Sequence, residues 1–239
     1  MNYKTDISKS IDELSEKFAQ ILLEVLGHGK KPINIALSGG STPKAVFDFL
    51  AEYYKTKIEW NRINFFWGDE RCVPSNHHES NYLMTQEHLF NKIDFPPKNI
   101  FKIDGENNPK SEAQRYSEVI RKNVPLENGI PSFDLILLGL GKDGHTGSIF
   151  SNSINLILDN NICAVSEHPV THQKRITLTG TIINNAKKII FLVTGGSKNK
   201  TVDIVLNKKE GYEKLPASYI KPAKGELIWL FDQEAINIK

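Results

Sequence analysis

Short apolar runs alternate along this chain with segments in which apolar residues recur every three or four positions. The run from Phe133 to Leu138 is continuously apolar, as expected of a strand that is covered on both faces. Further strands are predicted at Ile33 to Leu37, Ile63 to Trp67, around Ile176 and Leu178, at Ile189 to Val193 and at Leu227 to Phe231. Helix-type spacing predicts helices over Ile7 to Val25, Val46 to Tyr54, Ser80 to Phe90, Ala113 to Lys122 and Lys198 to Leu206.

This alternation of strands and helices indicates βαβ units and a largely parallel sheet. Asn107 to Pro109 and Glu127 to Pro131 are predicted loops, and no linker, repeat or low-complexity tract divides the sequence. A chain of 239 residues is long enough to bury one sizeable core. We therefore expect one three-layer, Rossmann-like α/β domain over residues 1–239, with or without a small appended lobe.

Composition and charge limit the classes of partner. Hydrophobic residues make up 39% and charged residues 24%, both ordinary globular values, and the net charge is only +2. A nucleic-acid binder usually carries a concentrated basic face, so this charge favours a small anionic ligand. No apolar run approaches the roughly 20 residues that cross a bilayer, and the first 17 residues lack the apolar core of a signal peptide. We expect a cytoplasmic protein with no nucleic-acid, membrane or obligate protein partner.

Polar, glycine-rich loops follow four of the predicted strands, and ligands of open parallel sheets bind beyond the carboxyl ends of strands. In the first loop, Ser38 to Pro43, Thr42 suits a helix N-cap and Pro43 the first helical position. Gly39 and Gly40 let the backbone approach a ligand, and the helix N-terminus offers unpaired amides to an anion. The loop is thus either a phosphate site or a capped turn without a ligand.

The second loop carries three successive charged residues, Asp69, Glu70 and Arg71. Asp69 is suited to act as a base or an orienting carboxylate, and Arg71 to clamp a phosphate. The alternative is a local ion-pair network. A zinc site built from Cys72, His77 and His78 is a weaker alternative, since their spacing matches no standard structural zinc site, and we expect no metal.

The third and fourth loops carry the remaining candidates. In Leu138 to Ser148, three glycines surround Asp143 and His145, so both side chains should project from a tight loop after a buried strand. A histidine held there is suited to general base catalysis. In the fourth loop, Lys198 lies near a helix start, where a cation is unfavourable unless it meets an anion or extends into solvent. The sequence assigns no function to His28, His88, His168 or His172.

Taken together, these segments resemble the 6-phosphogluconolactonase family. The matching segments occur in family order and span nearly the whole chain: ALSGGSTP (36–43), FFWGDERCVP (65–74), HHESNY (77–82), FDLILLGLGKDGHTGSIF (133–150), RITLT (175–179), FLVTGGSK (191–198), LPAS (215–218) and WLFD (229–232). Each segment is weak alone, whereas the ordered set is highly specific.

The resemblance implies a fold shared with glucosamine-6-phosphate deaminases and ribose-5-phosphate isomerases. It also implies hydrolysis of 6-phospho-D-glucono-1,5-lactone in the oxidative pentose phosphate pathway, without a metal or an organic cofactor. By matching motif, His145 would be the catalytic base, and Asp69 and Asp143 active-site carboxylates. The phosphate would be bound by Arg71 and Lys198, by the loop residues Gly39, Gly40, Ser41 and Thr42, and by Arg175 as a further candidate.

Two other functions fit the same resemblance: an aldosamine-6-phosphate deaminase and a non-catalytic sugar-phosphate sensor. Deaminases carry a glutamate five residues after the loop histidine, and this chain has Phe150 there. A sensor would not be expected to keep Asp69, Asp143 and His145. The chain also departs from many lactonases, which continue this loop as SLFPG where it has SIFSN (148–152). That departure leaves the Asp-Gly-His segment intact.

Overall fold

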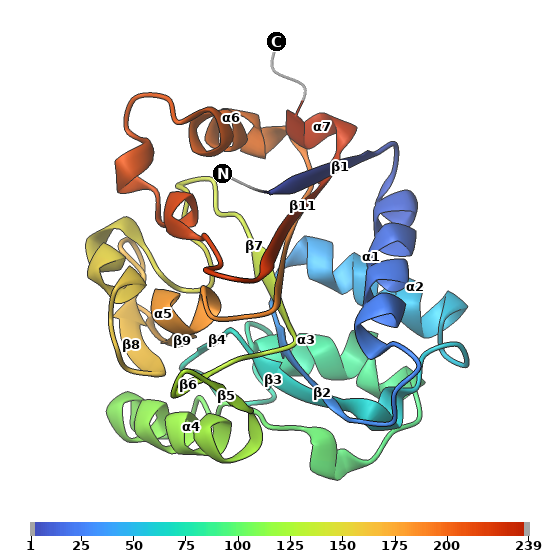
Figure 1. The fold of residues 1–239 in the computed structure, drawn as a ribbon. Helices are drawn as coiled ribbons and strands as arrows, with labels where there is room; N and C mark the ends of the chain where they lie inside the picture. Colours follow the sequence, from blue (N-terminus) through green and yellow to red (C-terminus); the bar gives the residue numbers. More distant parts are fainter. Residues whose placement is uncertain (1–2, 237–239) are drawn as a thin grey trace.

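The computed structural model describes residues 3–236, and its centre is a parallel sheet of six strands (Figure 1). Their spatial order is β1–β11–β10–β7–β2–β3, and all neighbouring pairs in it are parallel. The strands are β1 (Lys4–Ser8), β2 (Ile33–Leu37), β3 (Ile63–Trp67), β7 (Leu135–Gly139), β10 (Lys188–Val193) and β11 (Glu226–Asp232). Five of these strands were predicted from the sequence, and β1 is an additional strand at the edge of the sheet.

Burial on both faces explains why these runs form central strands. All five residues of β2 are buried, and so are all residues of β10 except the first. The rings of Phe191 and Trp229, on neighbouring strands, stack with centroids 3.8 Å apart. Such apolar, β-branched and aromatic side chains are stable only where helices or loops cover both faces of the sheet.

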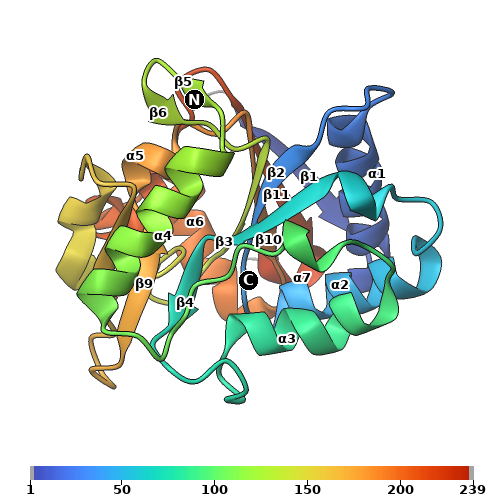
Figure 2. The same ribbon diagram turned by 90° about the horizontal axis from the view of Figure 1, so that it is seen from below.

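The helices lie on both sides of this sheet: α1 and α2 lie to one side in Figures 1 and 2, and α4 and α5 to the other. Side chains cap three of them, because Ser10, Ser80 and Asn108 accept backbone N–H bonds from the first turn. The helices are α1 (Ile11–Leu26), α2 (Ser41–Tyr53), α3 (Asn81–His88), α4 (Pro109–Asn123), α5 (Gly180–Ile183), α6 (Asn199–Asn207) and α7 (Gln233–Ile236). Short 3₁₀ turns are η1 (Trp60–Arg62), η2 (Phe90–Lys92), η3 (Pro97–Asn99), η4 (Ser151–Ile157), η5 (Gly196–Lys198), η6 (Tyr212–Lys214) and η7 (Pro216–Tyr219).

A second, antiparallel sheet lies on the α4 and α5 side of the molecule (Figure 1). Its order is β4–β9–β8, formed by β4 (Asp69–Arg71), β9 (Lys174–Leu178) and β8 (Cys163–Glu167). The predicted strand around Ile176 and Leu178 is confirmed, but it belongs to this sheet. Because β4 follows β3 after a single glycine, this sheet brings β9 to the carboxyl end of the main sheet.

Two sequence predictions near helix starts were wrong. Ile7, which fitted the helical spacing, lies in β1 and pairs with Phe231, a contact 224 positions away that local periodicity does not reveal. Helix α2 begins two residues earlier than expected, at Ser41, because Gly40 with φ 110° ends the loop. Thr42 and Pro43 are therefore the second and third helical residues, and Thr42 is not the N-cap.

Both predicted loops contain secondary structure. Asn108 is the N-cap of α4 and Pro109 its first residue, a known helix-start pattern. Strands β5 (Leu126–Glu127) and β6 (Ile130–Pro131) form a small hairpin closed by Asn128 and Gly129. Both closing residues have positive φ, 51° and 81°, as a type I′ turn requires, and Asn-Gly is the usual sequence for that turn.

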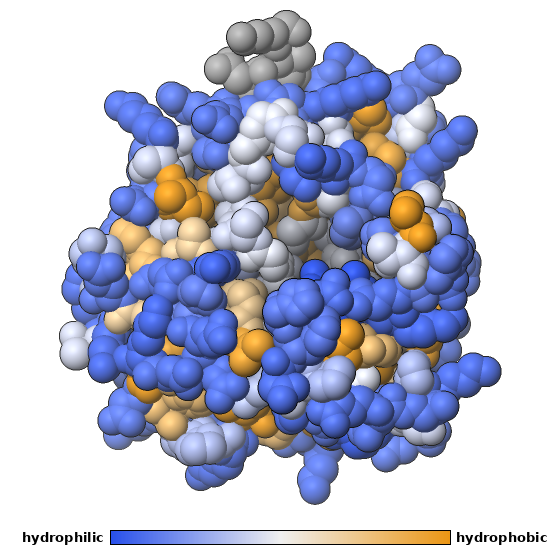
Figure 3. Space-filling model, turned by 180° about the vertical axis from the view of Figure 1, so that it is seen from behind, coloured by the Kyte–Doolittle hydropathy of each residue, from blue (hydrophilic) through white to orange (hydrophobic). Residues whose placement is uncertain are grey.

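The three-layer α/β fold with a largely parallel sheet is thus confirmed. The buried hydrophobic residues, with the exception of Phe150, form a single cluster, and we infer from it that the described residues fold as one domain. Within residues 3–236, no helix has the length and apolar character needed to span a membrane. The face drawn in Figure 3 is mostly hydrophilic and has a hollow near its middle.

Candidate active site

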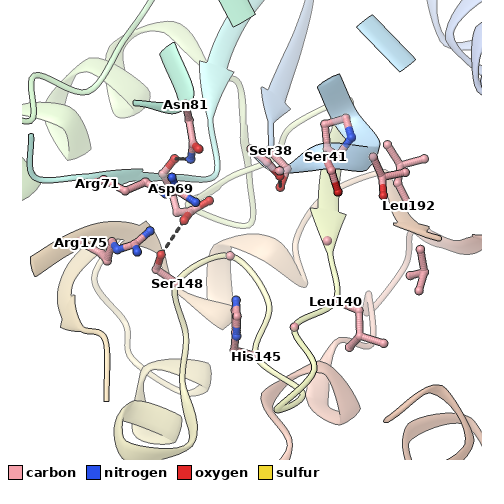
Figure 4. A pocket seen from close by; sticks show the side chains of 18 of the residues that line it. Ser38, Ser41, Asp69, Arg71, Asn81, Leu140, His145, Ser148, Arg175 and Leu192 are labelled. Atoms are coloured by element: carbon pink, nitrogen blue, oxygen red, sulfur yellow. Dashed lines mark hydrogen bonds between the residues drawn. The ribbon is translucent and has the colours of Figure 1, made fainter. Parts of the chain in front are cut away.

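A cavity of about 320 Å³ lies at the carboxyl ends of four neighbouring strands, β3, β2, β7 and β10. The four polar loops singled out in the sequence follow these four strands, so residues far apart in the chain meet there. The direction of chain progression changes between β2 and β7, which is the place where open α/β sheets bind ligands. Figure 4 shows Asp69, Arg71, Arg175 and Ser148 on one side of the cavity and Ser38 and Ser41 on the other.

The first loop is packed too closely for any residue but glycine at position 39. A Cβ added to Gly39 would overlap the side-chain amide of Asn81. That amide is itself fixed, because its Nδ2 donates to the carbonyl oxygen of Asp69 at 2.9 Å. Further along the loop, the hydroxyl groups of Thr42 and Thr194 are 2.6 Å apart and join the loops after β2 and β10. Gly39, Gly40, Ser41 and Thr42 all line the cavity, where the first amides of α2 are available to an anion.

The charged segment predicted as the second loop forms strand β4, so its side chains alternate between two faces. Asp69 and Arg71 line the cavity, whereas Glu70 points away from it and is only 3% exposed. Glu70 accepts backbone N–H bonds from Asn81 and Tyr82, each at 2.8 Å, and thereby caps α3. Within residues 3–236, no ion pair joins Asp69 or Glu70 to Arg71, so the sequence alternative of a local ion-pair network is not what the structure forms.

Asp69 is buried, and the side chain of Ser148 fixes its carboxylate. Ser148 Oγ donates to Asp69 Oδ2 at 2.5 Å, and both residues line the cavity (Figure 4). Ser148 lies three residues after His145, so this bond ties the histidine loop to β4. No pattern in the sequence assigns a function to Ser148.

Two arginines face each other across strands β4 and β9, because Arg71 and Arg175 are register partners. Both line the cavity, and the Nε atom of each is buried without a hydrogen-bond partner among the described residues. Burial and the nearby charge of Arg71 lower the pKa of Arg175. Like charges directly opposite each other on paired strands are destabilising, so this pair makes physical sense if an anion binds between or beside the guanidinium groups.

The histidine loop folds back on itself after β7. The amide of Gly141 donates to the carbonyl oxygen of His145 at 2.8 Å, and Gly144 has φ 80°. A Cβ on Gly141 would overlap His145 Nδ1 and Asp143 Oδ1, so only glycine lets these two groups approach each other here. Steric overlap thus explains why this tight loop needs glycine at position 141.

His145 lines the cavity, whereas Asp143 contacts His145 without lining the cavity itself. Asp143 Oδ1 is 2.5 Å from His145 Nδ1. Burial raises the pKa of Asp143, but the hydrogen bond and charge of His145 outweigh it and lower the pKa to about 2. Asp143 is therefore ionised at neutral pH and accepts a hydrogen bond from the Nδ1–H group of His145. In the neutral ring this leaves the lone pair on Nε2. A histidine in this tautomer is oriented to accept a proton.

Lys198 lies in η5 after β10 and lines the same cavity. Within residues 3–236, no carboxylate forms an ion pair with it. Burial and then the charge of Lys142 lower the pKa of Lys198, while Asp143 opposes this shift. A half-buried ammonium without a carboxylate partner is favourable only when an anion approaches it.

Further residues line the cavity that the sequence did not assign to catalysis or binding. Phe150 is buried, and its ring centroid lies 4.8 Å from that of His145. His168, to which the sequence assigned nothing, also lines the cavity from the turn between β8 and β9. The local sequence does not reveal that His168 lies in the cavity, because the antiparallel pairing of β9 with β4 brings this turn to the site. Thr194 and Asn81 complete the polar lining.

One group of side chains in the described part of the chain has the spacing to hold a metal ion. His77, His78 and Glu79 offer ligand atoms within 4.8 Å of one another, outside the lining of the cavity. Two of these atoms are already engaged, since His77 Nδ1 accepts from the Glu79 amide at 3.3 Å and Glu79 Oε2 from Gln173 at 2.9 Å. Cys72 is not part of the group, and burial raises the pKa of its thiol to about 11, which disfavours the thiolate that zinc needs.

Comparison with known proteins agrees with this geometry. The family model of glucosamine-6-phosphate isomerases/6-phosphogluconolactonase matches residues 5–229. A 6-phosphogluconolactonase of Treponema pallidum is 42% identical over 80% of this chain and 81% of its own. The crystal structure of 6-phosphogluconolactonase from Leishmania guyanensis has a TM-score of 0.87 at 27% identity, over 98% of both chains.

A monomeric glucosamine-6-phosphate deaminase has a TM-score of 0.83 at 22% identity, over 99% of this chain and 100% of its own, and this likeness shows the fold alone. The family model and the sequence relative extend over most of the chain, and the residues matched by the family model include all four loops around the cavity. The chain is therefore an enzyme of the glucosamine-6-phosphate isomerase/6-phosphogluconolactonase family.

Proposed function

We propose that this protein hydrolyses 6-phospho-D-glucono-1,5-lactone to 6-phospho-D-gluconate, the second step of the oxidative pentose phosphate pathway. The observation that carries the proposal is the cavity itself. One wall presents His145, oriented by Asp143, and the same cavity holds Arg71, Arg175 and Lys198, none of which has a carboxylate partner among the described residues. A base beside an anion site is the arrangement that hydrolysis of a phosphorylated lactone needs.

In the proposed reaction His145 is the general base. Its Nε2 accepts a proton from water while the water oxygen bonds to C1 of the lactone, and the carbonyl electron pair moves onto oxygen. Asp143 remains ionised and stabilises the imidazolium that forms, as orienting carboxylates do in catalytic triads. When the carbonyl re-forms, the bond from C1 to the ring oxygen breaks, and the imidazolium returns its proton to that oxygen. The new carboxylic acid then ionises in water.

The substrate phosphate would lie away from the reacting carbon and orient it. Arg71, Lys198 and the amides of Gly39 to Thr42 are proposed to bind it, with Arg175 as a further ligand. A phosphate monoester carries close to two negative charges at neutral pH, so it would relieve the repulsion between these cations. Binding a remote group in this way lowers the entropy cost of bringing C1 to the base.

Asp69 is proposed to orient a sugar hydroxyl rather than to move a proton. Its Oδ2 already accepts the Ser148 hydroxyl at 2.5 Å, and the carboxylate is buried at the cavity wall. The other carboxylate oxygen has the lone pairs to accept a substrate O–H. Asp69 is the one carboxylate among the cavity-lining residues that the structure describes.

The deaminase alternative lacks an acid in the right place. Position 150, where deaminases carry a glutamate, holds a buried phenylalanine beside His145. Glu70 caps α3, and neither Glu70 nor Glu79 lines the cavity, so neither substitutes for the missing group. A lactone carbonyl is already electrophilic, whereas opening a hemiacetal and expelling ammonia needs several proton transfers. The cavity therefore favours lactone hydrolysis.

The sensor alternative predicts binding without turnover. The deciding experiment is a coupled assay on freshly generated 6-phosphogluconolactone, with the spontaneous hydrolysis rate subtracted. We expect hydrolysis that scales with protein concentration and that persists after dialysis against a chelator, because no step above uses a metal. Tight binding of 6-phosphogluconate without such hydrolysis would replace the enzyme by a sensor.

A further inference from the structure

His168 is the second imidazole of the cavity. It follows β8 and lines the cavity together with Arg175 and Phe150. Its ring meets that of Phe150 nearly edge to face, with centroids 5.2 Å apart, and the Phe150 ring also contacts that of His145. Phe150 therefore joins His168 to the proposed base, and nothing in the proposed reaction uses His168.

The turn between β8 and β9 fixes the tautomer of His168. The backbone amides of Val170 and Thr171 both donate to its Nδ1, at 3.3 and 3.1 Å. An Nδ1 atom that accepts two N–H bonds carries a lone pair, so in the neutral ring the proton is on Nε2. Burial lowers the pKa of His168, as do the charges of Arg175 and His145, which keeps the ring neutral at neutral pH.

The Nε2–H group of His168 is a donor without a hydrogen-bond partner in the described part of the chain. Among residues 3–236 no acceptor lies within hydrogen-bond distance of it, although the backbone N–H and C=O of His168 and its Nδ1 are all bonded. The two arginines of the cavity supply positive charge, and His168 differs from them in being neutral. A neutral, fixed donor suits an uncharged oxygen.

We propose that His168 is a substrate-binding residue whose Nε2–H donates to a hydroxyl oxygen of the sugar part of the ligand. This inference rests on the proposed function for the identity of that ligand. His168 moves no proton in the reaction; it contributes to which sugar the cavity accepts and how tightly.

Two substitutions separate this role from a structural one. In His168→Asn the side-chain oxygen can take the place of Nδ1 and keep both turn bonds, but the side chain is too short to reach the ligand. In His168→Gln the terminal amide can take the place of Nε2–H and donate, while the turn loses its acceptor. If His168 binds the sugar, the Gln variant is the better enzyme; if it only holds the turn, the Asn variant is.

We expect His168→Asn to raise KM for the lactone about tenfold with kcat within about twofold of wild type, the pattern of a lost ground-state contact. His168→Gln should keep KM within about threefold. His172→Asn serves as the control, because His172 lies in the same turn, does not line the cavity and has φ 57°, which asparagine tolerates. Thermal unfolding of each variant shows whether it is folded.

A second readout locates the contact on the ligand. His168→Asn should weaken binding of 6-phosphogluconate about tenfold and leave the inhibition constant of inorganic phosphate unchanged. Equal losses for both ligands, an unchanged KM in His168→Asn, or the reverse order of the Asn and Gln variants would each overturn the proposal. These results are read against the wild type: if it hydrolyses lactone, a failure here concerns His168 alone, and if it does not, the proposed function fails first.

Discussion

Charged side chains are arranged differently at the two ends of the parallel sheet. At the amino end, cations and carboxylates are paired: Lys187 Nζ lies 2.7 Å from Asp134, and Lys188 Nζ lies 2.5 Å from Glu226. At the carboxyl end, Arg71 and Arg175 oppose each other and Lys198 has no carboxylate partner in the described chain. The amino end is arranged for stability, whereas the carboxyl end keeps its cations available for a ligand. The predictions below test this contrast.

The largest expected effect concerns the base at the carboxyl end. His145→Ala should lower kcat for lactone hydrolysis by roughly 10²- to 10⁴-fold, the usual contribution of general base catalysis. The affinity for 6-phosphogluconate should remain near wild type, because the phosphate is bound by other residues. Steady-state kinetics and calorimetry on the folded variant check both parts. Turnover close to wild type would remove His145 from the mechanism.

A pair of lysine substitutions compares the two ends directly. Lys198→Ala should weaken binding of 6-phosphogluconate by about 1.5–3 kcal/mol, or roughly ten- to 150-fold in Kd, since a charge-assisted bond is lost. Lys187→Ala, the matched change at the amino end, should leave Kd unchanged. Calorimetry measures both. Equal Kd values for the two variants would mean that Lys198 does not bind the phosphate.

Stability should show the opposite pattern. Asp134 accepts both the backbone amide of Asn34, at 2.8 Å, and the ammonium of Lys187. Asp134→Asn should therefore lower the free energy of unfolding by about 1 kcal/mol. Lys198→Ala should not lower it, because that half-buried cation has no carboxylate to lose. Urea unfolding of both variants decides this, and a larger loss in Lys198→Ala would contradict the contrast between the ends.

The smallest expected effect is a loss of folding stability at low pH. The folded pKa of Asp143, about 2, lies below its ordinary value of 3.8, so the folded state favours the ionised form. The resulting stabilisation is present above about pH 4 and is lost as the pH falls from there toward 2. In Asp143→Asn this loss of stability between about pH 4 and 2 should be absent. Thermal unfolding of both proteins between pH 2 and 5 measures it, and parallel curves would show that the His145 contact does not stabilise the carboxylate.

Much of the fold could be predicted because it is encoded in local patterns. The continuous runs of β7 and β10 fit only strands that are buried on both faces, and the stripe of α1 fits only an amphipathic helix. Strands β1, β4 and β8 were missed because they are defined by distant partners. The β5–β6 hairpin and the start of α4 were missed for another reason: their signals, Asn128-Gly129 and Asn108-Pro109, are present in the sequence and were taken for loops.

The candidate site could be predicted as far as it follows strand ends. The loops that carry Asp69, His145 and Lys198 come after strands of the parallel sheet. Because ligands of such sheets bind beyond the carboxyl ends of the strands, these loops were expected to meet. His168 enters from an antiparallel turn, and no sequence rule fixes where that turn lies relative to the main sheet. The roles assigned to the individual residues stay predictions until the variants are measured.

The central claim is that this cavity hydrolyses a phosphorylated lactone and does not deaminate an amino sugar. The most direct measurement gives one preparation of the wild-type protein both substrates, freshly generated 6-phosphogluconolactone in one assay and glucosamine 6-phosphate in the other. We predict lactone hydrolysis well above the spontaneous rate and no ammonia release above the control without enzyme. Ammonia release on the order of 1 s⁻¹ or faster, within the ordinary range of enzymes, would contradict the account and require an acid other than the one that Phe150 replaces.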